Sequence, residues 1–121
     1  MQDFRRLDIY KRAIDYCVEV YKFSTKLPMS EQYGLVSQIR RAVTSIPLNI
    51  SEGAGTNSNK EFYLFITYSY RSVNEVLACL ELIKKLSLSK EENKVESLER
   101  EGVELSRMVY TFSKKLKTKD L

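Results

Sequence analysis

The sequence has no histidine, and this absence removes the side chain that most often serves as a general base or metal ligand. Ser-His-Asp and Cys-His triads, HExxH zinc sites and the Glu-x-x-His ligands of di-iron bundles are therefore excluded. Cysteine is scarce as well. Cys17 and Cys79 are too few for a disulfide framework and are typical of small buried hydrophobic residues in a reducing compartment. These absences predict a protein that is not an enzyme and that holds no metal or cofactor.

Long apolar segments are also missing. No segment approaches the roughly 20 apolar residues that a helix needs to cross a bilayer. The charged start MQDFRRLDIYKR is not followed by the apolar stretch of a signal peptide. We therefore expect a cytoplasmic protein with no membrane contact. A length of 121 residues corresponds to one domain, residues 1–121, with a single core.

Only four glycines and two prolines interrupt the chain, and apolar residues recur at spacings of three and four almost throughout. This period predicts an all-α fold. The breaks divide the chain into four long helical segments joined by short loops, which is typical of an up-and-down, antiparallel four-helix bundle. Pro47 lies inside the second segment and should bend the helix or break it locally, because proline lacks a backbone N–H donor.

Polar residues mark where each helix should begin. We predict that Asp8 caps the first helix, which Leu27-Pro28 ends. Ser30 should cap the second helix, which ends at Gly53 or Gly55. The other two starts are marked by capping boxes, in which a serine precedes a glutamate by three residues: Ser58 with Glu61, and Ser89 with Glu92.

The fourth helical segment carries the most regular apolar seam. Its members alternate between spacings of three and four: Val95, Leu98, Gly102, Leu105, Val109, Phe112 and Leu116. A glycine in such a seam has no side chain to hold a neighbour at a distance. Gly102 therefore predicts the close approach of another helix.

The third helical segment is apolar on more of its circumference than one partner surface can cover. One seam follows its core-facing side: Phe62, Ile66, Ser69, Val73, Val76, Leu80 and Ile83. Tyr63, Tyr70 and Leu77 form a second seam, which we predict to be an interface between the subunits of a homo-oligomer. Two alternatives stay open, namely a ligand groove and a central helix that is packed deeply within one subunit.

A polar stripe follows the edge of the second helical segment. At about 100° per residue, five polar side chains fall within an arc of roughly 80°: Gln38, Arg41, Ser45, Asn49 and Glu52. The simplest interpretation is a hydrogen-bond network that fixes the helix register or a subunit contact. In a functional alternative, Arg41 binds phosphate while Gln38 and Asn49 contact a base or sugar. A catalytic role for Glu52 is disfavoured, because no histidine or activated nucleophile accompanies it.

Basic residues outnumber acidic residues by 20 to 16, which gives a net charge of +4 at pH 7. In an up-and-down bundle, the start of the first helix, the connection between the second and third helices, and the end of the fourth helix share one pole. This topology gathers nine cations there: Arg5, Arg6, Lys11, Arg12, Lys60, Lys114, Lys115, Lys117 and Lys119. Five acidic residues belong to the same pole and leave it a modest net positive charge: Asp3, Asp8, Glu52, Glu61 and Asp120. Such a cluster favours binding to the phosphates of RNA or DNA, and an ordinary solvated surface is the competing interpretation.

The first half of the chain contains several short motifs in a fixed order: Glu31-x-Tyr33-Gly34-Leu35, Gln38-Ile39-Arg40-Arg41-Ala42, Ser45-Ile46 and Asn49-Ile50-Ser51-Glu52-Gly53. A looser part follows, with Phe62, Phe65, Ser72 and Glu75. Together these motifs closely resemble the signature of the 23S rRNA intervening-sequence protein family, over roughly residues 4 to 86. The chain departs from the usual pattern of that family at Ser51 and at Ser69-Tyr70-Arg71.

The resemblance implies a bacterial four-helix subunit that assembles into a ring-like homopentamer, with no agreed enzymatic activity. In some bacteria such proteins are encoded within insertions of the large ribosomal RNA gene. Relatives include the accessory proteins of diversity-generating retroelements, which pair a basic barrel surface with nucleic acid and a reverse transcriptase. We therefore expect a non-enzymatic homo-oligomer that presents a basic surface to RNA or DNA. The alternatives are a protein–protein interaction scaffold and a small-ligand binder built on the polar stripe.

Overall fold

The computed structural model describes the backbone of residues 3–120 and the side chains of residues 3–118. This part of the chain contains four α-helices and no β-strand, which confirms the all-α, four-helix prediction. The helices are α1 (Asp8–Ser24), α2 (Leu35–Ala54), α3 (Asn59–Lys85) and α4 (Glu92–Asp120). Two short 3₁₀ helices precede α1 and α2, at Phe4–Arg6 and Met29–Glu31. None of the four helices, as far as they are described, combines the length and the apolar character that crossing a bilayer requires.

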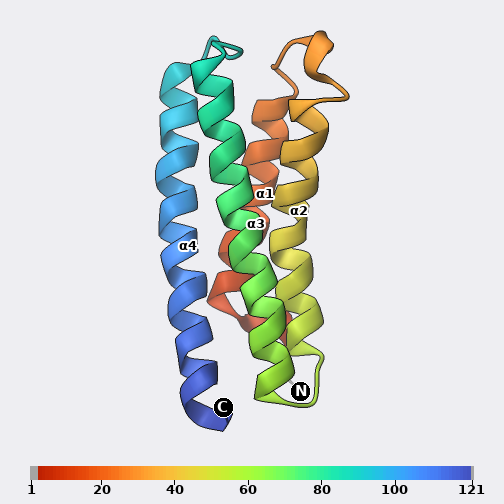
Figure 1. The fold of residues 1–121 in the computed structure, drawn as a ribbon, viewed down its shortest axis with the longest axis vertical. Helices are drawn as coiled ribbons and strands as arrows, with labels where there is room; N and C mark the ends of the chain where they lie inside the picture. Colours follow the sequence, from red (N-terminus) through yellow and green to blue (C-terminus); the bar gives the residue numbers. More distant parts are fainter. Residues whose placement is uncertain (1–2, 121) are drawn as a thin grey trace.

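The four helices lie side by side along the long axis of the molecule (Figure 1). The start of α1, the connection between α2 and α3, and the end of α4 lie at one end, which we call the terminal end. The connections from α1 to α2 and from α3 to α4 lie at the other end, which we call the loop end. Both α1 and α3 pack against α2 and α4, so each helix contributes one face to a common core.

A single cluster of mainly aliphatic side chains fills the space between the helices. The seam predicted on the third segment is buried along α3 from Phe62 to Ile83. The seam predicted on the fourth segment is buried along α4 as well, except that Phe112 is half-buried. Burial of each large aliphatic side chain stabilises the fold by roughly 1.5–3 kcal/mol, so these two seams supply much of the driving force for folding.

The first helix begins at Asp8, as predicted, but the predicted caps of the first two helices are wrong. Asp8 is the first residue of α1 and not its cap, a position that Leu7 takes without a side-chain hydrogen bond. Ser30 lies in the 3₁₀ turn that follows Pro28, and α2 begins only at Leu35. The carboxylate of Glu31 accepts a hydrogen bond from the Leu35 N–H at 3.4 Å. The cap position of α2 is Gly34, which has no side chain to accept a hydrogen bond.

The serines before the other two helices behave differently from each other. Ser58 caps α3 as predicted, because its hydroxyl accepts a hydrogen bond from the Glu61 N–H at 3.1 Å. The Ser89 cap prediction is wrong. The Ser89 hydroxyl accepts from the Glu91 N–H at 3.0 Å and closes a turn, so α4 begins only at Glu92.

Pro47 does not interrupt α2, which is helical from Leu35 to Ala54 and ends within the predicted range. The local break that we considered at Pro47 is therefore absent. Pro47 is buried, and its neighbour Ile46 has a carbonyl oxygen that accepts a hydrogen bond from the Ser69 hydroxyl at 3.0 Å. This buried bond ties α3 to α2 beside the proline.

Candidate nucleic-acid interface

The nine cations predicted to gather at one pole come from three separate parts of the chain. The structure places the start of α1, the first turn of α3 and the last turns of α4 at the terminal end (Figure 1). The side chain of Lys119 lies outside the described residues. The other eight form what we call the basic pole: Arg5, Arg6, Lys11, Arg12, Lys60, Lys114, Lys115 and Lys117.

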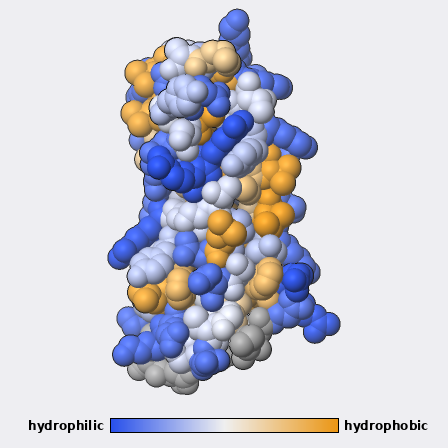
Figure 2. Space-filling view, turned by 90° about the vertical axis from the view of Figure 1, so that its right-hand side faces the viewer, coloured by the Kyte–Doolittle hydropathy of each residue, from blue (hydrophilic) through white to orange (hydrophobic). Residues whose placement is uncertain are grey.

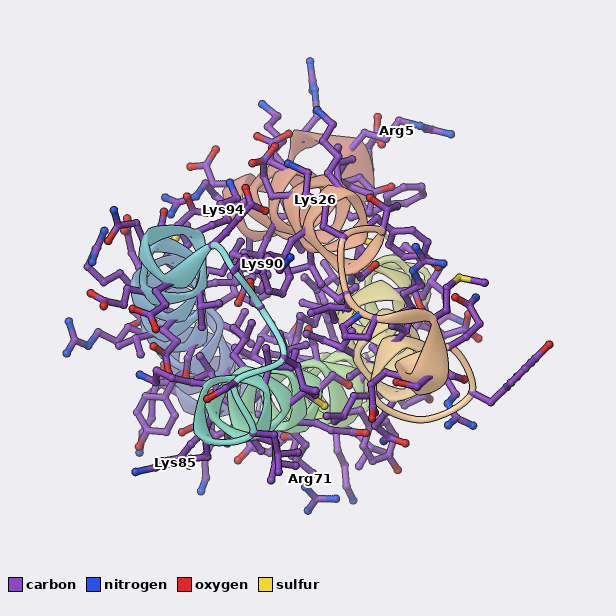
Figure 3. All side chains as sticks on the ribbon, turned by 90° about the horizontal axis from the view of Figure 1, so that it is seen from above. Arg5, Lys26, Arg71, Lys85, Lys90 and Lys94 are labelled. Atoms are coloured by element: carbon purple, nitrogen blue, oxygen red, sulfur yellow. The ribbon has the colours of Figure 1, made fainter. Side chains whose placement is uncertain are left out.

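Two members of the basic pole lie beside carboxylates. Arg5 lies 3.4 Å from Asp3, and Arg12 lies 3.1 Å from Glu104. Arg5 points outward from the bundle (Figure 3). The other six members form no ion pair with a described side chain. Six positive charges at one end therefore face solvent without a partner from the described residues, and their fields add.

Lysines at the loop end are more often neutralised by the chain itself. Four ion pairs lie there: Lys26 with Glu91 at 3.3 Å, Lys84 with Glu99 at 2.8 Å, Lys94 with Glu19 at 2.7 Å, and Lys22 with the same Glu19 at 3.9 Å. Figure 3 views this end and labels Lys26 and Lys94 beside α1. The hydrogen bond from Lys94 lowers the pKa of Glu19, and the hydrogen bond to Glu99 raises the pKa of Lys84. A larger share of the cations is therefore left without an ion-pair partner from the described residues at the terminal end.

Aromatic rings lie among the cations at the end of α4. The Lys114 Nζ lies 5.3 Å from the ring centroid of Tyr110, and the Lys117 Nζ lies 5.9 Å from that of Tyr63. The rings of Tyr70 and Tyr110 lie 5.8 Å apart. Cation–π contacts hold the lysine stems along the α3–α4 surface while their ammonium groups stay in water. Rings interleaved with cations in this way are typical of surfaces that bind single-stranded nucleic acids.

The three predicted interface residues on α3 lie along its boundary with α4 of the same chain. Tyr63, Tyr70 and Leu77 are half-buried, and Leu77 reaches the backbone of α4 at Gly102. Side chains and backbone of α4 thus cover part of this seam within one subunit. Much of the apolar excess of α3 is explained in this way, and the assignment of these residues to a subunit interface stays a prediction.

More exposed apolar side chains lie on two other surfaces. The first, which we call the α1/α2 patch, consists of Ile14, Val18, Tyr21 and Leu48. Val18 is 47% exposed and Leu48 is 63% exposed. Figure 2 shows apolar residues at mid-height on the face formed by α2 with α1 beside it. The second surface, which we call the α3 strip, consists of Leu64, Tyr68 and Leu82, and the exposed Arg71 and Glu75 lie between Tyr68 and Leu82 on the same helix face.

The polar stripe of α2 forms hydrogen bonds within itself and with α3. Asn49 donates to the backbone oxygen of Ser45 at 2.9 Å and to its hydroxyl at 2.8 Å. The Ser72 hydroxyl donates to the Ser45 hydroxyl at 2.9 Å. A second group joins Arg41 to Gln38 at 3.2 Å, and Gln38 in turn donates to the Glu75 carboxylate on α3.

Glu52, the last member of the stripe, is exposed and forms no hydrogen bond with a described side chain. It therefore lies apart from the two bonded groups. The bonds to Ser72 and Glu75 link α2 to α3. This arrangement favours a network that fixes the register of two helices over a site that contacts a ligand.

Burial makes the two cysteine thiols less reactive. Desolvation raises the pKa of the Cys17 thiol, and desolvation together with the charge of Glu75 raises the pKa of the Cys79 thiol. A thiol becomes reactive only as the thiolate, so both cysteines are poor nucleophiles near neutral pH. Within residues 3–118, no three acidic or cysteine side chains converge as metal ligands do.

A groove of about 540 Å³ lies between the start of α1 and the second half of α4. Its apolar lining consists of Leu7, Ile9, Met108 and Phe112. Arg6, Arg107 and Lys115 line it with positive charge, and Asp8, Glu104 and Thr111 add oxygen atoms. Because Arg6 and Lys115 belong to the basic pole, this groove opens onto it.

Sequence reasoning missed Arg107, Thr111 and the apolar neighbours of the groove as site residues. The available signal was the spacing of Arg107, Thr111 and Lys115, which recur at intervals of four and so lie on one face of α4. Spacing alone does not tell which helix that face meets. The structure shows that it meets the start of α1.

Comparisons with known proteins agree with the motifs of the first half of the chain. The family model for 23S rRNA-intervening sequence protein matches residues 5–111. A crystal structure of a protein with unknown function from the S23 ribosomal protein family of Bacteroides thetaiotaomicron is similar, with a TM-score of 0.74 and 24% sequence identity. The match covers 88% of this chain and 98% of that chain, and it shows a shared fold. No curated protein matches the sequence.

Proposed function

The chain belongs to the 23S rRNA-intervening sequence protein family, and from this premise we propose that it is a non-enzymatic, cytoplasmic nucleic-acid-binding protein. In this proposal its subunits are up-and-down, antiparallel bundles that assemble into a ring-like homopentamer and present their basic poles to RNA or DNA. The observation that carries the proposal is the set of six cations at the terminal end that form no ion pair with a described side chain.

Binding at the basic pole would be dominated by phosphate contacts and would have little sequence preference. The ammonium groups of lysine and the guanidinium groups of arginine contact phosphate oxygens, and every nucleotide carries these oxygens. In a ring, the poles of neighbouring subunits lie side by side, so the positive field increases with the number of subunits. A protein partner such as a reverse transcriptase would then share the nucleic acid with this surface.

The test is a fluorescence titration of a labelled RNA and of a labelled DNA duplex at two salt concentrations. Each phosphate contact lowers the slope of log K against log salt by about 0.9 for a duplex. Contacts to four phosphates would therefore raise the Kd about 150-fold between about 50 mM and about 200 mM salt. The proposal would be contradicted if neither nucleic acid bound at about 50 mM salt, or if the Kd did not change with the salt concentration.

Two unlike apolar surfaces support assembly into a ring. A closed ring needs a heterologous contact, in which one surface of a subunit binds a different surface of its neighbour. The α1/α2 patch and the α3 strip are two such surfaces, and they lie on different helices. Because each is partly exposed, covering them removes apolar area from water and favours association.

A charge placed in the α1/α2 patch should reduce the particle mass. We expect Val18→Glu and Leu48→Glu to give smaller particles by light scattering and to keep the helical circular dichroism, because both side chains are exposed within the subunit. Val103→Glu is the matched control, since Val103 lies on α4 outside both apolar surfaces. An unchanged mass for the first two variants would contradict the assignment of this patch to a subunit interface.

The alternative function is a protein–protein interaction scaffold that does not bind nucleic acid. It is favoured by the same exposed patch, if another protein covers it in place of a second subunit. Two results together would favour this alternative. A defined protein would be captured by the chain even after nuclease treatment, and neither RNA nor DNA would bind in the titration.

A further inference from the structure

We propose that the groove between the start of α1 and α4 holds one unpaired base together with its phosphate, so that the protein binds single strands in preference to duplexes. This inference rests on the proposed function and adds the form of the nucleic acid. Neither the charge of the basic pole nor phosphate contacts alone distinguish a single strand from a duplex. The groove does, because a base inside a duplex is paired and stacked and does not enter it.

The size and position of the groove suit a nucleotide. A volume of about 540 Å³ lies within the range of about 300–1,000 Å³ that small-molecule sites occupy. The groove lies at the terminal end, where the start of α1 faces α4 (Figure 1). A strand that follows the basic pole therefore passes its opening.

The apolar lining of the groove provides the surface that a base requires. Leu7, Met108 and Phe112 are half-buried, so part of each side chain faces the groove. The Phe112 ring is held by an edge-on contact with Phe62, with ring centroids 5.3 Å apart. A base placed here exchanges contact with water for contact with a fixed ring and aliphatic atoms, which is worth about a tenfold gain in affinity or more.

Three cations around the groove provide the phosphate contact. Arg6, Arg107 and Lys115 line it, and none of them forms an ion pair with a described side chain. Two of the three are arginines, whose planar guanidinium groups bind phosphate through two parallel hydrogen bonds. The charge of the groove thus complements the phosphate of one nucleotide.

The oxygen atoms of the groove favour a base as its occupant. Asp8 forms no ion pair with a described side chain, and the Thr111 hydroxyl forms no hydrogen bond with one. The amino groups of cytosine, adenine and guanine are donors, and an aspartate carboxylate accepts from them.

The test compares a labelled 12-nucleotide single strand with the duplex of the same sequence, by fluorescence anisotropy at about 50 mM salt. We expect the full chain to bind the single strand about tenfold more tightly or better. Thr111→Phe fills the groove from an exposed position and should abolish this preference while leaving the Kd for the duplex unchanged. Thr25→Phe, an exposed threonine at the loop end, is the matched control and should keep the preference.

A second variant separates base contact from electrostatics. Asp8→Ala removes a negative charge near the basic pole, so it should tighten duplex binding. If the Asp8 carboxylate contacts the base, the same change lowers the ratio of single-strand to duplex affinity. Equal affinities of the unaltered chain for the two forms, or a preference that survives Thr111→Phe, would overturn this inference and leave the proposed function standing. Failure to bind either form would overturn both.

Discussion

Gly102→Ala is expected to lower the free energy of unfolding by about 2 kcal/mol, although alanine ordinarily stabilises a helix relative to glycine by about 1 kcal/mol. A Cβ at this position would lie 2.6 Å from the Tyr16 hydroxyl and 2.7 Å from the Leu77 Cδ2. Both distances are far below van der Waals contact, and the two atoms belong to α1 and α3. The methyl group would therefore push α4 away from two helices at once.

The Tyr16 hydroxyl has little freedom to move away. It is buried and donates a hydrogen bond to the Leu98 carbonyl oxygen at 2.8 Å. Burial is also the main cause that raises the pKa of Tyr16, so the hydroxyl stays protonated and keeps donating across the pH range in which the protein is handled. A shift of the ring would leave this buried donor without its acceptor, at a cost of about 1–3 kcal/mol.

Urea denaturation followed by circular dichroism measures the effect. Gly55→Ala is the matched control, because a Cβ there would lie 3.5 Å from the nearest atom, the Glu52 carbonyl oxygen, and should change stability by about 0.5 kcal/mol or less. In a Tyr16→Phe background, Gly102→Ala should cost less than in the unaltered chain, since the obstructing oxygen is gone. A Gly102→Ala protein as stable as the unaltered chain would contradict the close approach of the helices.

The sequence predicts the helices and their buried seams well because both depend on a period that each segment carries alone. The α4 seam and the unusual position of Gly102 are examples, since a helix of 3.6 residues per turn places these residues on one side in any bundle. Helix starts are predicted less well. Ser30 was predicted to cap α2, but the 3₁₀ turn after Pro28 includes Ser30, and the helix begins only at Leu35 with Gly34 at the cap position.

The surface properties depend on partners that are distant in the sequence. Arg12 and its partner Glu104 are 92 positions apart, so no local pattern predicts that this cation is neutralised. The same limitation explains Tyr70, whose place on the helix was predictable but whose neighbour Tyr110 belongs to α4. The groove was missed for this reason too, because its two walls meet only in the folded bundle.

Removal of three lysines from the end of α4 should weaken RNA binding about a hundredfold at about 50 mM salt. The triple variant is Lys114→Ala, Lys115→Ala and Lys117→Ala, and all three lysines are exposed. Each exposed ammonium–phosphate contact is worth up to about 1 kcal/mol, so the loss of three contacts costs about 3 kcal/mol, which is on the order of a hundredfold in Kd. The slope of log K against log salt for a DNA duplex should fall in magnitude by about 2.7, which is three phosphates at about 0.9 each. The triple variant leaves Tyr110 and Tyr63 unaltered, the two rings over which Lys114 and Lys117 lie.

A second triple variant separates a local pole from the total charge of the protein. Lys26→Ala, Lys84→Ala and Lys94→Ala lower the net charge by the same three units, but these lysines are already paired with carboxylates at the loop end. Because each pair is partly exposed and screened by water, its removal should change stability little and should leave the salt slope nearly unchanged. Equal weakening of RNA binding in both triple variants would mean that net charge, and not the basic pole, attracts the nucleic acid.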